Sequence, residues 1–206
     1  VLFFLHGRFG QSECWHPILD RLLPRFRCLL LDLPGFGESF SARERGLTLL
    51  EHGYLVGTLL KQLLSPGEKA VLIGHDIGGS VIQLASIELR DRLAGIVLIN
   101  CTGLSEPAHG LKAGWFGWQA RWRLSRLLSR SHRLEVSIEN LLLRPWLVRS
   151  SRESLVQALR AVEVSWPGPF ERQFWKKEIQ SLPVPVMLLW GAHDSINPAE
   201  IGRAHV

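Results

Sequence analysis

Short apolar runs recur along the chain and predict buried β-strands. Each run is three to five residues long and apolar throughout, without the in–out alternation that is typical of a half-buried strand. Parallel strands that are covered on both faces have this pattern. We predict five such strands, at Val1–Leu5, Cys28–Leu31, Val71–Ile73, Ile96–Ile99 and Val186–Trp190.

Amphipathic helical patterns separate the first four of these strands. One runs from Trp15 to Leu23 and stops at Pro24, because proline cannot continue a helix. A second starts at Thr48, which together with Glu51 has the sequence of a capping box. Strands that alternate with helices predict an α/β fold with a doubly wound, mostly parallel sheet. The apolar faces predicted for the second and third helices are Val56, Leu59, Leu60, Leu63 and Leu64, and Val81, Leu84, Ala85, Ile87 and Leu89.

The alternation of strands and helices stops in the second half of the chain. Residues 104–182 contain amphipathic stretches rich in Trp, Leu and Arg, and no strand pattern of the same kind. We interpret this segment as a helical cap inserted before the last visible strand, above the carboxyl ends of the sheet where ligands bind. Residues 1–103 then form the N-terminal part of an incomplete core, and residues 183–200 contribute its last visible strand and following loop.

Composition narrows the functional classes. The 206 residues allow one domain with a sizeable core, and the net charge of +5 is modest, with much of the basic excess between Lys112 and Arg160. Every apolar run is shorter than the roughly 20 residues that span a bilayer, so we expect no stable membrane insertion.

The three cysteines, Cys14, Cys28 and Cys101, lack the spacing of metal ligands. This predicts free thiols, no metal and a cytoplasmic location. No nucleic-acid-binding motif is present, and nothing indicates an oligomeric state.

Both ends of the chain look interrupted. The sequence begins inside a predicted strand, and residues 201–206 read like the translation of a common sequencing-library adapter. We therefore expect a fragment whose natural sequence ends near Glu200.

The most informative stretch, Gly74–Gly79, directly follows the apolar run Ala70–Ile73 and precedes a helical pattern. A strand, a polar residue flanked by glycines and then a helix predict a nucleophile elbow, a sharp turn that presents one side chain at the top of a parallel sheet. Here that side chain is Asp76. Gly74 and Gly78 have no Cβ, so the helix can approach the bent backbone closely.

Three further motifs follow the ends of predicted strands. His6–Gly10 follows the first, Asp32–Ser39 follows the second, and Trp190–Asp194 ends the last. With the elbow, and in this order, they resemble the α/β-hydrolase fold superfamily, in particular its Asp-nucleophile branch of haloalkane dehalogenases and epoxide hydrolases. The resemblance extends over nearly the whole chain.

The resemblance implies a role for several residues. Asp76 would be the nucleophile, the backbone N–H groups of Arg8 and Ile77 would form an oxyanion hole, and Asp194 would orient a catalytic histidine. In the family that histidine follows one further helix and strand, beyond the residues given, and His205 is too close to Asp194 in sequence to be assigned. We therefore expect the chain as given to be inactive, and the resemblance implies no cofactor.

An aspartate at the elbow changes the expected chemistry. A carboxyl group with a reference pKa of about 3.9 is ionised at neutral pH and needs no base before it attacks. Attack on a carboxylic ester would give an anhydride, whereas attack on a saturated carbon that carries a halide gives an ordinary ester. The sequence thus favours a hydrolase that cleaves a carbon–halogen or related bond of a small organic substrate through a covalent Asp-ester. Two alternatives remain: a non-catalytic pseudo-hydrolase that binds ligands, and an esterase that uses Asp76 as a general base.

The sequence gives little information about the identity of the substrate. The single tyrosine, Tyr54, lies outside the predicted cap, which argues against epoxides because related epoxide hydrolases use cap tyrosines. Arg8 could hold an anionic leaving group. Candidate pocket residues are Phe9, Trp166 and Trp175.

Overall fold

The computed structural model describes residues 1–8, 10–39, 47–101, 169–194 and 197. Of the predicted features, Phe9, Trp166, residues 104–168 of the cap and the tail 201–206 lie outside the described residues. None of the described helices is long and apolar enough to cross a membrane.

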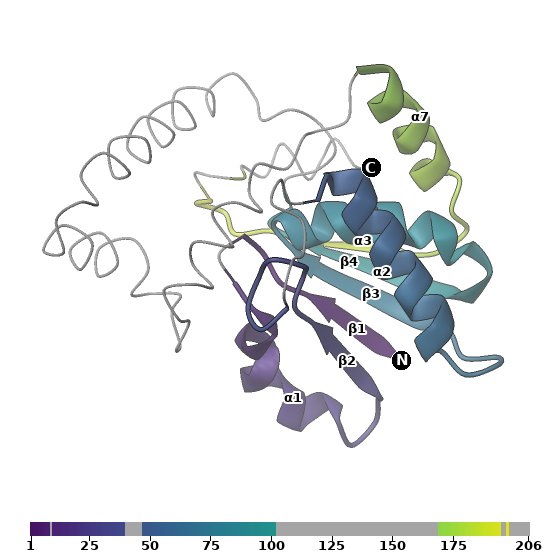
Figure 1. The fold of residues 1–206 in the computed structure, drawn as a ribbon. Helices are drawn as coiled ribbons and strands as arrows, with labels where there is room; N and C mark the ends of the chain where they lie inside the picture. The colour runs from purple at the N-terminus through teal and green to yellow at the C-terminus, as the bar shows by residue number, and fades with distance from the viewer. Residues whose placement is uncertain (9, 40–46, 102–168, 195–196, 198–206) are drawn as a thin grey trace, which may run out of the picture. The chain divides into compact units, whose positions relative to one another are not determined.

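Five parallel strands form one sheet, which confirms the predicted α/β fold class (Figure 1). The strands are β1 (Leu2–Leu5), β2 (Cys28–Leu31), β3 (Ala70–His75), β4 (Leu93–Ile99) and β5 (Val186–Leu189). Their order is β2-β1-β3-β4-β5, and every neighbouring pair is parallel. All five predicted strands are present. β3 and β4 extend beyond the apolar runs because residues such as Gly74 and Gly95 also pair in the ladder.

Helices connect these strands in the predicted order. A 3-10 turn (Ser12–Trp15) and α1 (His16–Leu22) follow β1, α2 (Leu49–Leu63) precedes β3, and α3 (Ile77–Glu88) lies between β3 and β4. A second 3-10 turn (Arg90–Arg92) leads into β4, and α7 (Pro169–Gln180) precedes β5. The helix predicted from Trp15 to Leu23 is therefore present as α1, and the 3-10 turn precedes it. Pro17 stands in the first turn of α1, where its missing N–H is not needed.

The capping box at the start of α2 is formed as predicted. The Thr48 hydroxyl accepts a hydrogen bond from the Glu51 N–H at 3.1 Å, and the Glu51 carboxylate accepts one from the Thr48 N–H at 2.8 Å. Both main-chain donors would otherwise lack a partner within the helix. The helix therefore begins where the sequence placed it.

The buried face of α2 differs from the prediction at Leu59 and Leu63, of which Leu59 is only partly buried. Val56, Leu60 and Leu64 are buried as expected, but Leu63 is 41% exposed. The buried face also contains Gly57, where an added Cβ would lie 2.7 Å from the Cβ of Glu88 on α3. Close contact with α3 at the glycine turns the buried face of α2 away from Leu63.

Helix α3 is buried along most of its length and not on one face only. Every residue from Ile77 to Ser86 is buried, because α3 packs against β3 and β4 and also against α2 and α7 (Figure 1). Ile87, predicted to be in the apolar face, is partly exposed near the end of the helix. The elbow is therefore attached to the most enclosed helix of the described fold.

The strands are not all covered on both faces. All four residues of β1 are buried, and on one side the ring of Phe4 packs 5.3 Å from that of Trp15. In β5, by contrast, Val186 is 50% and Met187 is 56% exposed. The prediction of full coverage is wrong for β5, which stands at the end of the order of the described strands and pairs with β4.

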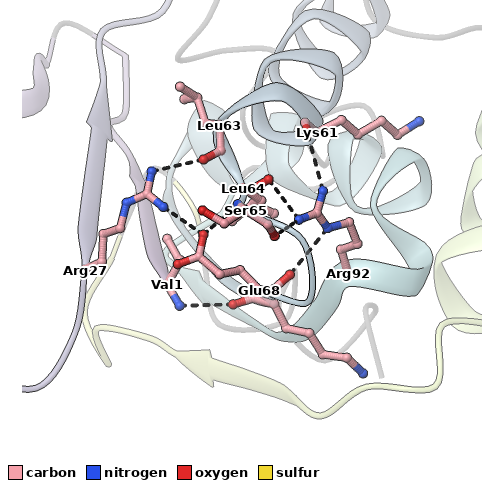
Figure 2. A network of polar contacts seen from close by, with 9 residues as sticks. Val1, Arg27, Lys61, Leu63, Leu64, Ser65, Glu68 and Arg92 are labelled. Atoms are coloured by element: carbon pink, nitrogen blue, oxygen red, sulfur yellow. Dashed lines mark hydrogen bonds and ion pairs between the residues drawn. The ribbon is translucent and has the colours of Figure 1, made fainter.

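Two arginines bind the carbonyl groups at the end of α2 (Figure 2). The Arg92 guanidinium donates to the carbonyl oxygens of Leu64, at 2.9 Å, and of Ser65. Arg27 donates to the carbonyl oxygen of Leu63 at 3.0 Å and to the Glu68 carboxylate at 2.7 Å. These carbonyls have no partner within the helix and carry the negative end of its dipole, so the cations stabilise the α2 terminus.

Replacing Arg92 tests this contribution. Arg92→Ala should lower the free energy of unfolding by about 1–2 kcal/mol, because the helix end loses several charge-assisted hydrogen bonds. Chemical denaturation measures the loss. Arg25→Ala, at an exposed arginine, is the matched control and should change stability by less than about 0.5 kcal/mol. Equal effects of the two substitutions would contradict the capping role.

Candidate active site

The sheet order places a topological switch point at the carboxyl ends of β1 and β3. The chain leaves β1 toward β2 on one side and leaves β3 toward β4 on the other, so the connection reverses between these two central strands. Ligands in open α/β sheets bind at such a switch point. Arg8 follows β1 and Asp76 follows β3, so both predicted site residues lie there.

Asp76 occupies the turn between β3 and α3 in an unusual backbone conformation. Its φ of 50° and ψ of −121° lie in a region that non-glycine residues rarely adopt. The turn is held by a hydrogen bond from the Asp76 N–H to the carbonyl of Ile99 at 3.1 Å, and by one from the Gly79 N–H to the carbonyl of Asp76 at 3.1 Å. Backbone strain of this kind is concentrated at functional sites. The strand–turn–helix geometry that the motif predicted is present.

The elbow glycines allow backbone segments to touch. A Cβ on Gly74 would lie 2.6 Å from the Gly78 carbonyl oxygen and 2.7 Å from the Gly79 Cα. A Cβ on Gly78 would lie 2.6 Å from the carbonyl oxygen of Leu5 in β1. Neither position has room for a side chain, so the close approach of α3 to β1 and β3 depends on both glycines.

The Asp76 carboxylate is held on one side by Arg8. The Arg8 backbone N–H donates to Oδ2 at 2.9 Å, and the Arg8 Nε lies 3.7 Å from the same oxygen. The two side chains are 17% and 14% exposed. The N–H expected in an oxyanion hole therefore points at the Asp76 carboxylate itself. The other expected donor, the N–H of Ile77, is the first of α3 and has no acceptor within the helix.

Asn197 holds the other side of the carboxylate. Its side-chain Nδ2 donates to Asp76 Oδ1 at 3.2 Å and to the carbonyl oxygen of Asn100 at 2.9 Å. Asn197 is only 5% exposed. Both oxygens of the elbow carboxylate thus accept hydrogen bonds from the protein.

Asp194 lies at the same end of the sheet, after β5. Its Oδ1 accepts a hydrogen bond from the Asn197 N–H at 2.9 Å, and its Oδ2 accepts one from the Asn100 side-chain amide. The Asn100 side-chain oxygen accepts in turn from the Gly191 N–H at 3.2 Å. The structure therefore joins the two predicted catalytic carboxylates, Asp76 and Asp194, through Asn197.

Sequence reasoning missed both asparagines. Asn100 directly follows the apolar run of β4, and polar residues at that end of a parallel strand are site candidates, so this signal was available. Its φ of 43° is also one that asparagine tolerates better than most residues. Asn197 carries no comparable signal, since it follows Asp194 by three residues in a loop.

His6 braces the loop after β1. Its Nε2 accepts a hydrogen bond from the Leu33 N–H at 3.0 Å, so its Nδ1 carries the proton and donates to the Gly7 carbonyl at 2.8 Å. Both ring nitrogens are used, and the ring is fully buried. Burial lowers the pKa of His6, which keeps the imidazole neutral. These contacts fix the loop that carries Arg8.

Asp32 organises the loop after β2. Its Oδ2 accepts a hydrogen bond from the Glu38 N–H at 3.0 Å, and its Oδ1 accepts one from the Ser12 N–H. Gly37 has a φ of 51°, and a Cβ there would collide with the Asp32 carboxylate. The described contacts of Asp32 thus give it a structural role in this loop.

Two buried histidines predict a loss of stability in acid. Burial lowers the pKa of His52, as it does that of His6, and both side chains are at most 1% exposed. The unfolded chain therefore binds more protons than the folded chain below the reference pKa of about 6.5, and stability falls as the pH falls through that value.

Urea denaturation between pH 8 and pH 5 measures this dependence. His52→Gln should flatten it, with a change in slope of at most about 1.4 kcal/mol per pH unit. The control Gln180→Asn, at an exposed amide of α7, changes no titratable group and should leave the slope unchanged. An unaltered slope in His52→Gln would show that this histidine does not contribute.

The remaining predicted site residues are less informative. Trp175 lies on α7, where its ring is 5.1 Å from that of Phe174, and its role in a substrate pocket stays a prediction. Within the described ranges, no three His, Cys, Asp or Glu side chains gather where they could hold a metal ion. The site as described consists of Asp76, Arg8, Asn197, Asn100 and Asp194.

Comparisons with known proteins agree on the family. A model of the alpha/beta hydrolase fold matches residues 1–204. The chain is 24% identical to the dihydrolipoyllysine-residue acetyltransferase component of the acetoin cleaving system of Cupriavidus necator, over 99% of this chain and 54% of that protein. It is also 24% identical to the pimeloyl-[acyl-carrier protein] methyl ester esterase of Pectobacterium carotovorum, over 97% of this chain and 78% of that protein.

A solved structure shares the fold. The thermophilic esterase of Thermogutta terrifontis matches with a TM-score of 0.66 and 23% identity, over 99% of this chain and 75% of that one. The chain thus spans about half the length of the first relative and about three quarters of the other two proteins.

Proposed function

Because this chain belongs to the α/β hydrolase fold family, we propose that it is a hydrolase that cleaves the carboxylic ester of a small molecule, with Asp76 as the reacting group. The relative named as a methyl ester esterase supports an ester substrate over the haloalkane favoured by the sequence. The observation that carries the proposal is the elbow carboxylate, with Arg8 and Asn197 bound to its two oxygens at the switch point of the sheet.

A carboxylate can hydrolyse an ester without forming an anhydride. Asp76 would act as a general base: it takes a proton from water while the water oxygen bonds to the ester carbonyl carbon. The N–H of Ile77 would stabilise the negative oxygen of the tetrahedral intermediate, while the N–H of Arg8 stays bound to Asp76 Oδ2. When the carbon–oxygen bond to the alcohol breaks, Asp76 returns the proton to the leaving oxygen. The products are an acid and an alcohol.

Carbon–halogen cleavage through an Asp-ester is the second candidate. It is favoured by the two hydrogen bonds that the carboxylate accepts, because such contacts stabilise the ionised form and hold it ready for attack. An Asp76 oxygen would displace halide from a saturated carbon, and water would then cleave the resulting ester.

Parallel assays of acid and halide release separate these functions. The protein at its natural length would be incubated with methyl esters of aliphatic acids and with haloalkanes of matched chain length, beside Asp76→Ala as the inactive control. We expect ester cleavage that is lost in the variant, without halide release. Halide release alone would favour the second candidate. No turnover of either class by a folded protein would favour a pseudo-hydrolase that only binds ligands.

A further inference from the structure

Asn197 is the residue that connects the two predicted catalytic carboxylates. It lies in the loop after β5, and every one of its main-chain and Nδ2 contacts ends within the site or the loop that carries it. No sequence motif assigned it a role.

The orientation of the Asn197 amide is fixed by its acceptors. Nδ2 faces the carbonyl oxygen of Asn100 at 2.9 Å and the carboxylate oxygen Oδ1 of Asp76 at 3.2 Å. Neither acceptor carries a hydrogen when Asp76 is ionised, so only the amide nitrogen can face them. Both amide hydrogens are then used, one for each acceptor.

The main chain of Asn197 is fixed as well. Its N–H donates to Asp194 Oδ1 at 2.9 Å, and its carbonyl oxygen accepts a hydrogen bond from the Trp190 indole N–H at 2.7 Å. The residue is only 5% exposed. With the main chain fixed at two groups and the side-chain amide at two more, the amide has one orientation, and that orientation directs a donor at the elbow carboxylate.

We propose that Asn197 is a positioning residue that holds the ionised Asp76 carboxylate in its reactive orientation and couples it to Asp194. The use of Asp76 in catalysis rests on the proposed function, but the contact between Asn197 and Asp76 does not. The two can therefore be tested separately.

The charged groups around Asp76 come from three elements. Arg8 follows β1, Asp194 follows β5, and His75 ends β3 directly before the elbow. Asn197 contacts both carboxylates, Asp76 through its side-chain amide and Asp194 through its main-chain N–H. Replacing it with a carboxylate removes the donor and puts a third negative charge beside Asp76 and Asp194, which disfavours ionisation at residue 76.

A nuclear magnetic resonance titration of aspartate carboxyl carbons tests the contact without requiring activity. The signal of residue 76 is identified by its absence from Asp76→Asn. In Asn197→Asp, the midpoint of this signal should move to higher pH by roughly one unit or more relative to the parent. Gln180→Glu, the same change of amide to carboxylate at an exposed residue of α7, should leave the midpoint in place.

A second variant keeps the test decisive if Asn197→Asp fails to fold. Asn197→Ala removes the donor without adding charge, and the midpoint should move in the same direction by a smaller amount. For the protein at its natural length, the acid limb of the pH profile of kcat/KM should move with the midpoint in both variants. An unchanged midpoint in a folded Asn197→Ala or Asn197→Asp protein would overturn the proposal. A shifted midpoint with no hydrolysis by the parent would support the positioning role and refute the proposed function.

Discussion

Asp76→Asn is expected to lower kcat/KM for ester hydrolysis by about 10³-fold, within the range that general base catalysis contributes. The amide keeps the shape of the carboxylate but cannot accept a proton from water. Its oxygen can still accept the Arg8 N–H, but its Nδ2 would face the Asn197 Nδ2, so the variant keeps one of the two hydrogen bonds on residue 76. We therefore expect the loss to fall on kcat, with a melting temperature within a few degrees of the parent.

The comparison with an exposed aspartate isolates the role of the elbow. Asp20→Asn makes the same chemical change on the surface of α1 and should leave kcat/KM within a factor of two of the parent. Steady-state kinetics on one methyl ester, with thermal unfolding followed in parallel, measures both. If Asp76→Asn kept more than a tenth of the activity of the parent, Asp76 would not be the general base.

Gly78→Ala is expected to cause the largest loss of stability, about 3 kcal/mol. The new Cβ would lie 2.6 Å from the carbonyl oxygen of Leu5 and would also collide with the carbonyl oxygen of His6. Both are main-chain atoms of the β1 end and cannot rotate away as a side chain could. Helix α3 would have to move away from β1, and the elbow would move with it, so activity should fall together with stability.

Substitution of a glycine with no close neighbours distinguishes the cost of steric crowding from the cost of backbone strain. Gly67 has a φ of 80°, and no atom lies within 4 Å of an added Cβ. Gly67→Ala should cost only the backbone term, about 1–2 kcal/mol, and leave kcat/KM unchanged. Urea denaturation compares the two variants. If Gly67→Ala were as damaging as Gly78→Ala, the close approach of α3 to β1 would not be what the elbow glycine provides.

The fold followed from local patterns in the sequence. The apolar runs located all five described strands, and Thr48 with Glu51 located the start of α2, because strand burial and helix capping depend on neighbouring residues. Leu63 was misplaced because the buried face of α2 is set by close contact at Gly57 with another helix. The exposure of β5 was also missed, since a run of apolar residues does not show whether a strand is central or at an edge.

The site was predictable only in part. Asp76, Arg8 and Asp194 each follow a strand, so parallel topology alone brings them to one end of the sheet. Asn197 could not be found this way, because it does not directly follow a strand and no local pattern marks its contact with Asp76. The elbow motif also did not identify the class of substrate. A carboxylate can attack carbon or activate water, and the elbow motif alone does not decide between the two.

A single turnover in ¹⁸O-labelled water, with protein in excess over a methyl ester substrate, tests most directly whether Asp76 activates water. Mass spectrometry of the released acid and of the peptide that contains Asp76 locates the label. General base catalysis predicts ¹⁸O in the acid and none in the peptide, because water attacks the substrate carbonyl directly. Label in the Asp76 side chain would show a covalent intermediate and would contradict the proposed mechanism.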